Sequence, residues 1–391
     1  MYKTPRYHPF ASLIFQATLY YTGLTLMASF IVSYSTELSA AEATETPLKD
    51  TPVEKTLDES GSVRIYRTRE EKREAGLQRQ ITPWLTVSGL AEGEVLYEDF
   101  DTKEGKADDS GRDESASLQF GFIVSPFEVA KAEVILEYDT DKDKVEADEA
   151  FLSLEKDPWE LSLGKQYTPF GVYFSNFVSG PLVEFGETQA NEVATLAYGP
   201  SDELDLLLTA YRGRARKQGK NSGEWNWSLA TEFWLNDDWS FGLSYQSNLA
   251  DSDSRLLEDN NDRYSNRVAG VSGYLLWAGE QFEATLEALA ATGSFEELDP
   301  DRNKPWAWNA ELVHFYRDSN FEIAFRIEGS GELEDEPRVQ FGPAITWRTG
   351  KYASLTLEYL HGEFEDELAT TENDDIYDHV DRVGAILSIA F

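Results

Sequence analysis

Cysteine is absent from this sequence of 391 residues, and only four histidines are present. Without cysteine the chain forms no disulfide bond and offers no thiolate ligand to a metal. Basic residues are also scarce, with 34 Lys and Arg against 72 Asp and Glu, so the formal net charge is −38 at pH 7. A nucleic-acid-binding protein needs a basic surface, and this charge therefore argues against a nucleic-acid partner.

Recognisable metal and cofactor motifs are lacking too. Residues 362–378 carry eight carboxylates and neither Lys nor Arg. Such oxygen-rich segments suit hard cations such as Ca²⁺, but they also hydrate a loop or bridge to lipopolysaccharide through divalent ions. The DNNDR run at Asp259 lacks the spacing of a calcium loop. We therefore expect no cofactor and no metal site.

The first 41 residues have the pattern of a secretory signal peptide. Lys3 and Arg6 precede an apolar stretch at 10–32, and small residues follow at 39–43. Cleavage after Ala41 or after Ala43 fits this pattern. A membrane-anchoring helix is the alternative, which the polar residues within the apolar stretch disfavour. We predict a signal peptide at 1–41.

Residues 42–83 lack hydrophobic periodicity and are rich in Thr, Glu, Pro and Lys near their start. This composition predicts a flexible periplasmic linker. Residues 66–80, YRTREEKREAGLQRQ, are a candidate short charged helix. This segment is either a solvated helix or part of the same linker, or it is a periplasmic interaction element or a partial plug, and the sequence leaves these readings open.

From Trp84 to Phe391 the pattern alternates between apolar and polar residues, and no window sustains a helical period. In the last run, HVDRVGAILSIAF, Val383, Leu387 and Phe391 share one face, and Arg382 and Ser388 share the other. Sixteen such segments are found. They begin near Trp84, Ser115, Val129, Val145, Trp159, Phe185, Asp202, Trp225, Trp239, Asn266, Gln281, Trp306, Asn320, Arg338, Lys351 and His379.

Short and long connections alternate between these segments. The short ones are SPFE, KDP, GPSD, NDD, AGE, RDSN and RTGK. This alternation predicts an all-β fold, a transmembrane antiparallel β-barrel of about 16 strands over residues 84–391, preceded by a short periplasmic segment. A soluble β-sandwich is the alternative, but it does not require such alternation. We expect the outer membrane of a Gram-negative bacterium as the location, with lipid and lipopolysaccharide as partners.

The residues at the ends of the segments indicate contact with the membrane interface and with the barrel-assembly machinery. Trp and Tyr residues cluster there, where an interfacial belt is expected. They are Trp84, Trp159, Trp225, Trp239, Trp306, Tyr316 and Trp347. The terminal Phe391 closes an alternating strand, an ending typical of substrates of the barrel-assembly machinery.

A barrel of sixteen strands leaves an aqueous lumen. Polar residues at inward positions are candidates for its wall, where they select solutes by charge or are simply hydrated. The candidates are Glu133, Glu137, Glu149, Glu160, Gln166, Glu283, Glu287, Glu322, Arg326, Glu328, Glu358 and Arg382.

The stretch GKQYTPFGVYFSNFVSGPLVEFGET, residues 164–188, interrupts the strand pattern. It contains two prolines and an unusual number of aromatic residues, and the segment count places it among the long loops. A loop of this kind is predicted to fold into the barrel and narrow the lumen. Packing over the rim or against a neighbouring subunit is the alternative.

The region around this loop resembles the siderophore porins of the LbtU type. Asp148-Glu149-Ala150 matches the strand before the loop, and the chain departs from the pattern at Gly180, where the family has Asp. The other matching positions are Gly164, Lys165, Gln166, Tyr167, Pro169, Phe170, Gly171, Pro181, Leu182, Gly186, Glu187 and Thr188. The resemblance implies a sixteen-stranded outer-membrane barrel that moves an iron–siderophore complex.

We therefore expect a channel for passive or semi-selective passage of a small solute, with ferric siderophores as candidates and a homo-oligomer as a possible assembly. A general or anion-selective porin is the alternative. An outer-membrane hydrolase is a third reading, because His361 and His379 flank one long loop that could bring them together. Neither histidine belongs to a recognisable nucleophile motif, so an enzyme is not predicted.

Overall fold

The computed structural model describes residues 73, 79–106, 111–236, 238–300, 302–316, 319–349, 352–365, 369 and 376–391. All of them belong to one unit, residues 58–391. The predicted signal peptide and most of the predicted linker therefore lie outside the described residues.

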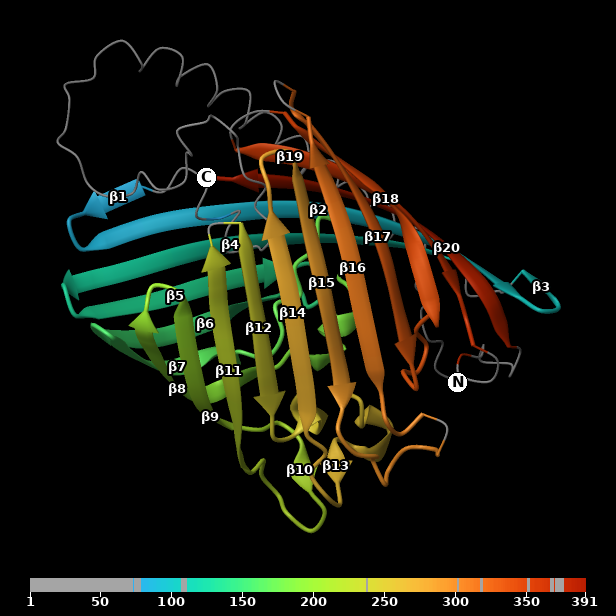
Figure 1. The fold of residues 1–391 in the computed structure, drawn as a ribbon, viewed down its shortest axis with the longest axis horizontal. Helices are drawn as coiled ribbons and strands as arrows, with labels where there is room; N and C mark the ends of the chain where they lie inside the picture. The colour runs from blue at the N-terminus through green and yellow to red at the C-terminus, as the bar shows by residue number, and fades with distance from the viewer. Residues whose placement is uncertain are drawn as a thin grey trace, which may run out of the picture. The chain divides into compact units, whose positions relative to one another are not determined.

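Sixteen long strands form an antiparallel sheet that closes on itself, which confirms the predicted fold class (Figure 1). Each strand pairs with the next along the chain, and β20 pairs with β2, with Tyr97 opposite Val383. The strands are β2 (Leu85–Thr102), β4 (Gly111–Phe127), β5 (Ala130–Asp139), β6 (Lys144–Lys156), β7 (Trp159–Tyr167), β8 (Gln189–Ser201), β9 (Leu204–Arg212), β11 (Trp225–Asn236), β12 (Trp239–Gln246), β14 (Gly270–Ala278), β15 (Phe282–Ala291), β16 (Trp306–Phe315), β17 (Phe321–Gly331), β18 (Val339–Arg348), β19 (Ala353–Glu363) and β20 (Tyr377–Ala390).

Each strand begins within four residues of its predicted start. The largest offsets are at β4, β8 and β14, which begin at Gly111, Gln189 and Gly270. Alternation located the strands well because every strand has one face in water and one in lipid, so that the two-residue period is kept along its length.

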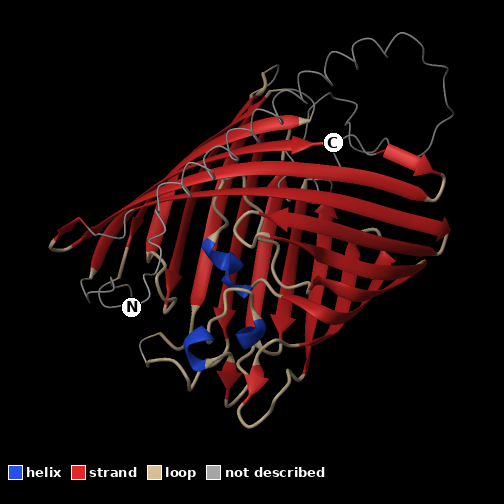
Figure 2. Ribbon diagram, turned by 180° about the vertical axis from the view of Figure 1, so that it is seen from behind, coloured by secondary structure: helices blue, strands red, loops and turns tan. Residues whose placement is uncertain are grey.

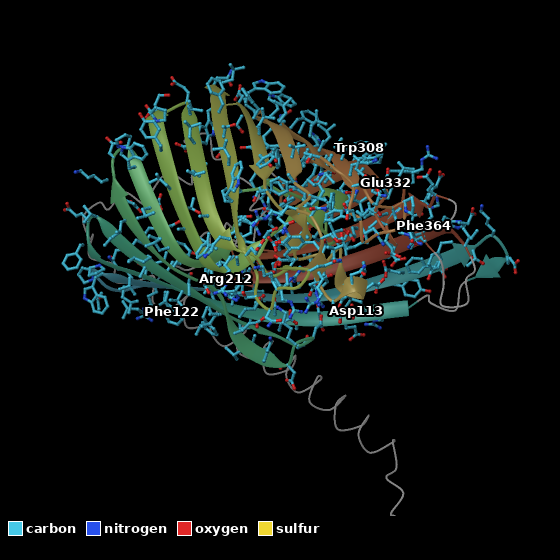
Figure 3. All side chains as sticks on the ribbon, turned by 90° about the horizontal axis from the view of Figure 1, so that it is seen from below. Asp113, Phe122, Arg212, Trp308, Glu332 and Phe364 are labelled. Carbon is cyan, nitrogen blue, oxygen red and sulfur yellow. The ribbon has the colours of Figure 1, made fainter. Side chains whose placement is uncertain are left out.

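The two faces of the barrel are inverted relative to a soluble protein. On β17, Phe325 is 49% exposed on the outside, whereas Arg326 and Glu328 are fully buried inside. Figure 3 shows nitrogen- and oxygen-bearing side chains crowded within the ring of strands. An apolar outer face of this kind is stable against lipid, whereas in water it would be a large exposed apolar surface. The chain is therefore an outer-membrane protein.

The predicted aromatic belt lies on this outer face. The seven aromatic residues at the strand ends are all between 37% and 58% exposed. They are Trp84, Trp159, Trp225, Trp239, Trp306, Tyr316 and Trp347. Trp and Tyr favour the membrane–water boundary because their rings combine an apolar body with a polar group.

The seven predicted short connections lie together at one end of the barrel, which bacterial barrels turn towards the periplasm. The opposite end carries the longer loops, with one exception. Residues 140–143 alone join β5 to β6, so the prediction of strict long–short alternation was wrong at this position. This sequence, TDKD, forms a tight turn in which Asp143 adopts a φ of 46°, a conformation that Asp tolerates.

Short elements accompany the barrel. β1 (Arg79–Thr82) pairs with β2 and lies within the range predicted as linker. β3 is Gly105–Lys106, and β10 (Arg216–Lys217) pairs in parallel with β13 (Arg263–Tyr264). Three 3-10 turns lie among the described residues, namely η1 (Leu182–Gly186), η2 (Leu249–Asp251) and η3 (Glu258–Asn260), and Arg73 is in helical conformation. No helix in the described part of the chain is both long and apolar enough to cross a membrane.

The last residue helps to close the ring. The Phe391 amide donates to the Gly89 carbonyl at 2.8 Å, and the Gly89 amide donates back at 2.6 Å. The Phe391 ring packs edge-on against Phe120, with 5.9 Å between centroids. A side chain at position 89 would collide with this ring, 2.5 Å from its Cε2.

Candidate channel constriction

Residues 168–188, which connect β7 to β8, lie inside the barrel, and we call them the constriction loop. Figure 2 shows its helix η1 within the ring of strands. Both ends of the loop bind Gln246 at the end of β12. Thr168 Oγ1 donates to Gln246 Oε1 at 3.0 Å, and Gln246 Nε2 donates to Thr188 Oγ1 at 2.9 Å.

Buried carboxylates of the barrel wall bind the backbone of this loop. Glu287 on β15 accepts the amides of Val172 at 2.8 Å and Tyr173 at 3.0 Å. Glu311 on β16 accepts the backbone and side-chain N–H groups of Asn176 at 2.8 and 2.7 Å. A carboxylate that accepts two or more N–H groups gives strong charge-assisted bonds, so each glutamate fixes one turn of an otherwise irregular segment.

Two further glutamates continue the series along the loop. Glu358 on β19 accepts the amides of Val178 at 2.6 Å and Ser179 at 3.0 Å. Glu328 on β17 accepts the Leu182 amide at 2.5 Å, where η1 begins. Along the loop, backbone groups without regular secondary structure are thus paired with wall side chains, as buried backbone requires.

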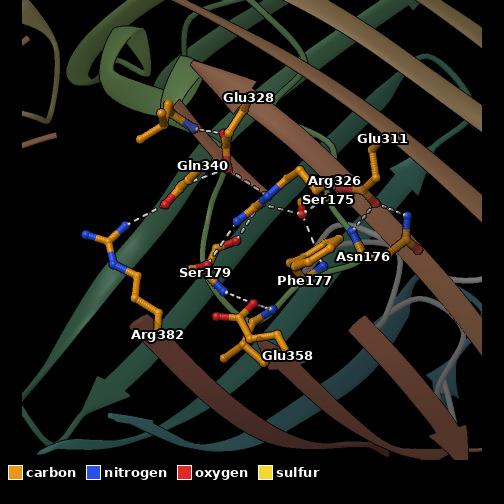
Figure 4. Close-up of polar contacts among 12 residues, drawn as sticks. Ser175, Asn176, Phe177, Ser179, Glu311, Arg326, Glu328, Gln340, Glu358 and Arg382 are labelled. Carbon is orange, nitrogen blue, oxygen red and sulfur yellow. Dashed lines mark hydrogen bonds and ion pairs between the residues drawn. The ribbon is translucent and has the colours of Figure 1, made fainter. Parts of the chain in front are cut away.

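Arg326 on β17 lies among these carboxylates and is fully buried (Figure 4). It forms an ion pair with Glu328 at 2.7 Å and donates to Ser179 O at 2.9 Å and Ser179 Oγ at 3.0 Å. It also donates to Ser175 Oγ at 3.1 Å, and its guanidinium lies 4.4 Å from the centre of the Phe177 ring. Arg326 therefore joins the wall charges to the middle of the loop.

The apolar residues of the loop form a core inside the barrel. Phe170, Val183 and Phe185 are 5% exposed or less and pack with Leu289 of β15 and Leu249 of η2. The aromatic character of the loop thus reflects a packed surface within the lumen. Burial of these side chains stabilises the loop in addition to the polar contacts.

Two glycines of the loop permit its path. Gly171 has a φ of +80°, which residues with a side chain rarely adopt. At Gly180, a Cβ would lie 1.7 Å from Glu184 Oε2. The departure from Asp at this position has a steric explanation, because the Glu184 carboxylate takes the space that a side chain would need.

The other matching residues are at the ends of the loop. Lys165 Nζ donates to the Ala147 carbonyl at 2.7 Å, and Gln166 Nε2 donates to Ser162 Oγ at 3.0 Å. Tyr167 closes β7 and is exposed on its outer face, whereas Pro169 is half-buried. Pro181 and Gly186, both buried, bracket η1.

The external β12–β14 connection, residues 247–269, braces the end of the constriction loop. Asp253 N donates to Glu187 O at 2.7 Å, and Gln189 N donates to Asp253 Oδ2 at 2.8 Å. Nearby, the buried carboxylate of Asp251 accepts the Ala215 amide at 3.0 Å and Asn226 Nδ2 at 2.6 Å. Burial raises the pKa of Asp251 to about 7 despite these hydrogen bonds.

The structure separates the predicted lumen-wall residues into different environments. Glu287, Arg326, Glu328 and Glu358 lie beneath the constriction loop. The others line the remaining wall. Three of them form ion pairs: Glu133 with Arg73 at 3.5 Å, Glu322 with Arg348, and Arg382 with Glu98 at 2.7 Å. Glu137 accepts a hydrogen bond from Gln119 at 3.3 Å. Glu149 lies opposite Ile135 in the neighbouring strand, and Glu160 is half-buried opposite Ala197.

Sequence reasoning missed several residues that contact the loop or the space beside it. Glu311 and Glu98 occupy inward positions of β16 and β2, so the alternation that identified Glu328 also contained the signal for them. Glu336 and Asp253 lie in loops, where no periodicity indicates direction.

A cavity of about 500 Å³ lies between the constriction loop and the wall formed by β2, β18 and β20. Its lining is rich in carboxylates and contains one basic residue. The lining residues are Leu96, Glu98, Ser179, Gly180, Pro181, Leu182, Glu184, Phe185, Glu187, Asp253, Ser254, Glu336, Gln340 and Arg382. Arg382 donates to Glu98 at 2.7 Å and to Gln340 at 3.1 Å, so its charge is already partnered.

The two histidines considered for hydrolysis lie near each other on the outer face of the barrel, with ring centroids 5.5 Å apart. His361 Nδ1 is 2.8 Å from Asp381 Oδ1. His379 contacts Asp101 at 3.1 Å and Asp378 at 3.2 Å. Both imidazoles thus have carboxylate partners that link β2, β19 and β20.

Comparisons with known proteins agree with this architecture. No protein-family model matches the chain. The chain is 27% identical over 328 residues to the "UPF0422 protein" of Coxiella burnetii (strain RSA 493 / Nine Mile phase I), covering 76% of this chain and 68% of that protein.

Solved structures share the fold at low sequence identity. The outer membrane channel DcaP of Acinetobacter baumannii matches with a TM-score of 0.56 and 12% identity over 81% of this chain and 99% of that one. The anion-selective porin from Comamonas acidovorans matches with a TM-score of 0.55 and 12% identity, over 78% of this chain and 99% of that one. Pseudomonas putida OprB matches with a TM-score of 0.57 and 9% identity, over 79% of this chain and 94% of that one. The chain therefore has the fold of outer-membrane porins.

Proposed function

We propose that this protein is an outer-membrane channel through which small hydrophilic solutes diffuse past the constriction loop. The observation that carries the proposal is the fixed position of this loop inside the barrel, bound to the buried carboxylates Glu287, Glu311, Glu328 and Glu358. A loop bound at so many points narrows the lumen permanently, so it limits the size of solutes without a gating step.

The geometry favours a channel over an outer-membrane hydrolase. His361 and His379, the residues that suggested hydrolysis, lie on the outer face rather than beside the cavity, and each binds Asp side chains. The cavity of about 500 Å³ is the feature that faces a solute inside the barrel.

Proteoliposome swelling tests the channel proposal. Purified protein is reconstituted, and swelling is measured in isotonic arabinose, sucrose and raffinose. Rapid swelling in arabinose with a steep decrease towards raffinose is expected. Vesicles that swell no faster than protein-free vesicles in any sugar would refute a diffusion channel. Equal rates in all three sugars would refute a constriction.

Passage of a ferric siderophore is the finer form of the proposal, and its support is the sequence resemblance over residues 148–188. Growth on scarce iron, compared between a deletion strain and its complemented counterpart with one purified siderophore supplied, tests it. Complementation that restores growth only when the siderophore is present supports the proposal. Equal growth of both strains with each of several siderophores refutes it while leaving the channel proposal intact.

A further inference from the structure

We propose that the cavity beside the constriction loop selects cationic solutes over anionic ones, an inference that rests on the proposed channel function. The cavity lies where the constriction loop approaches β2, β18 and β20, with Ser179, Gly180 and Pro181 on one side and Leu96 and Glu98 on the other. Charges at such a narrow place act on a solute at short range and in a medium from which much water is excluded.

The charges that line the cavity are predominantly negative. The five carboxylates come from four different elements: Glu98 from β2, Glu184 and Glu187 from the constriction loop, Asp253 from the β12–β14 connection and Glu336 from the β17–β18 connection. Acidic rings of this kind give pores cation selectivity.

Arg382 is the basic side chain of the lining, and it offsets only part of this negative charge. Its Nε lies 2.7 Å from Glu98 Oε1, and its Nη1 donates to Gln340 Oε1. Pairing with Glu98 cancels one unit of charge of each sign, and the lining residues include no arginine or lysine besides Arg382. An anion that enters the cavity would therefore find its arginine already bound.

The wall of the lumen beyond the cavity continues the negative character. Glu92 on β2 and Glu133 and Glu137 on β5 are inward and at most 7% exposed. The basic groups that face them are also partnered, because Lys131 lies 3.2 Å and Arg73 lies 3.5 Å from Glu133. Because these side chains are buried, they act on a cation in the lumen through their electrostatic field and not through direct contact.

One carboxylate of the cavity makes the selectivity depend on pH. Burial raises the pKa of Glu336 to about 7, although the positive charge of Arg382 opposes this rise. The other charged groups around it are Glu328 on β17, Glu98 on β2 and Asp335 of its own connection, all of which favour its neutral form. Glu336 therefore gains its charge as the pH rises through about 7, and cation preference is expected to be greater at pH 8 than at pH 6.

The inference also restricts the class of siderophore that suits the channel. A ferric complex with a net positive charge, such as a trihydroxamate that keeps a free amine, is favoured. A ferric polycarboxylate complex with a net negative charge is disfavoured, because it would bring like charges together in the cavity.

Reversal potentials in planar bilayers test this inference. The full chain is reconstituted across a tenfold KCl gradient, and the permeability ratio of K⁺ to Cl⁻ is measured at pH 6 and pH 8. We expect a ratio of roughly ten at pH 8. The variant Glu98→Gln/Glu184→Gln/Glu336→Gln should lower it several-fold, and Arg382→Gln should raise it. Glu128→Gln, which removes an exposed carboxylate from the β4–β5 turn, is the matched control and should leave it unchanged.

The possible outcomes distinguish failure of the cation-selectivity inference from failure of the channel proposal. Channels that open but favour Cl⁻, or show no preference, would overturn the inference and leave the channel proposal intact. A cation preference that the triple variant leaves unchanged would overturn the assignment to this cavity. Absence of any conductance, together with absence of sugar-dependent swelling, would overturn the proposed function itself.

Discussion

Replacement of Arg326 by Met is expected to release the middle of the constriction loop. The change keeps much of the side-chain length but removes the ion pair with Glu328 and the hydrogen bonds to Ser175 and Ser179. Removal of one partner of a buried ion pair costs about 3–5 kcal/mol, because the other charge stays buried without compensation. For the docked loop, this range corresponds to a roughly hundredfold to several-thousandfold smaller equilibrium constant.

Hydrogen exchange in detergent micelles measures this change at the amides of Val178 and Ser179, which donate to Glu358 in the intact protein. The protection of these two amides against exchange is expected to fall by up to the same factor as the docking equilibrium constant. Single-channel conductance should rise and become noisier. Arg348→Met is the matched control, since Arg348 pairs with Glu322 about six residues, or roughly 20 Å, along the strand from Glu328. A folded Arg326→Met barrel with wild-type protection and conductance would refute the anchoring role.

Three further predictions concern the barrel outside the constriction. Because burial raises the pKa of Asp251 from 3.8 to about 7, its stabilising contribution is present at low pH and is lost as the pH rises through about 7. The full span between the two pKa values is roughly 4 kcal/mol, of which roughly 3 kcal/mol falls above pH 5. Unfolding temperatures should therefore fall from pH 5 to pH 8 in wild type and change less in Asp251→Asn, and equal slopes would contradict this prediction. Leu243→Arg places a charge on the lipid face, where Leu243 is 64% exposed, and should cost roughly 2–4 kcal/mol in urea unfolding from vesicles. A wild-type midpoint would show that this face does not meet lipid. Deletion of Phe391 removes its bonds to Gly89 and should reduce the heat-modifiable band on gels of membrane fractions, and an undiminished band would contradict its role in closure.

The sequence was sufficient to predict the barrel, since each strand repeats the same local rule. In β20, Val383 and Leu387 are exposed outside and Ser388 is buried inside, as the alternation indicated. The same rule failed to warn of the short β5–β6 turn, because loop length carries no two-residue period.

The role of the inward charges was not predictable from the same pattern. Alternation identified Glu328 and Arg326 as inward residues, but their partners lie far away in the sequence: Leu182 is 146 residues from Glu328 and Ser179 is 147 from Arg326. Only the folded barrel brings the loop onto these strands. Similarly, the missing Asp at position 180 became interpretable only once Glu184 was placed beside Gly180.

A paired cysteine measurement tests the central claim, an aqueous passage beside the constriction loop, most directly. Leu96 lines the cavity, whereas its neighbour Tyr97 is 45% exposed on the outer face, and the chain has no native cysteine. Bilayer current is recorded from Leu96→Cys and Tyr97→Cys before and after a water-soluble, charged methanethiosulfonate reagent is added. The structure predicts that the reagent reduces the current of Leu96→Cys and leaves that of Tyr97→Cys unchanged. An unaffected current in Leu96→Cys, with labelling confirmed by mass, would contradict the claim.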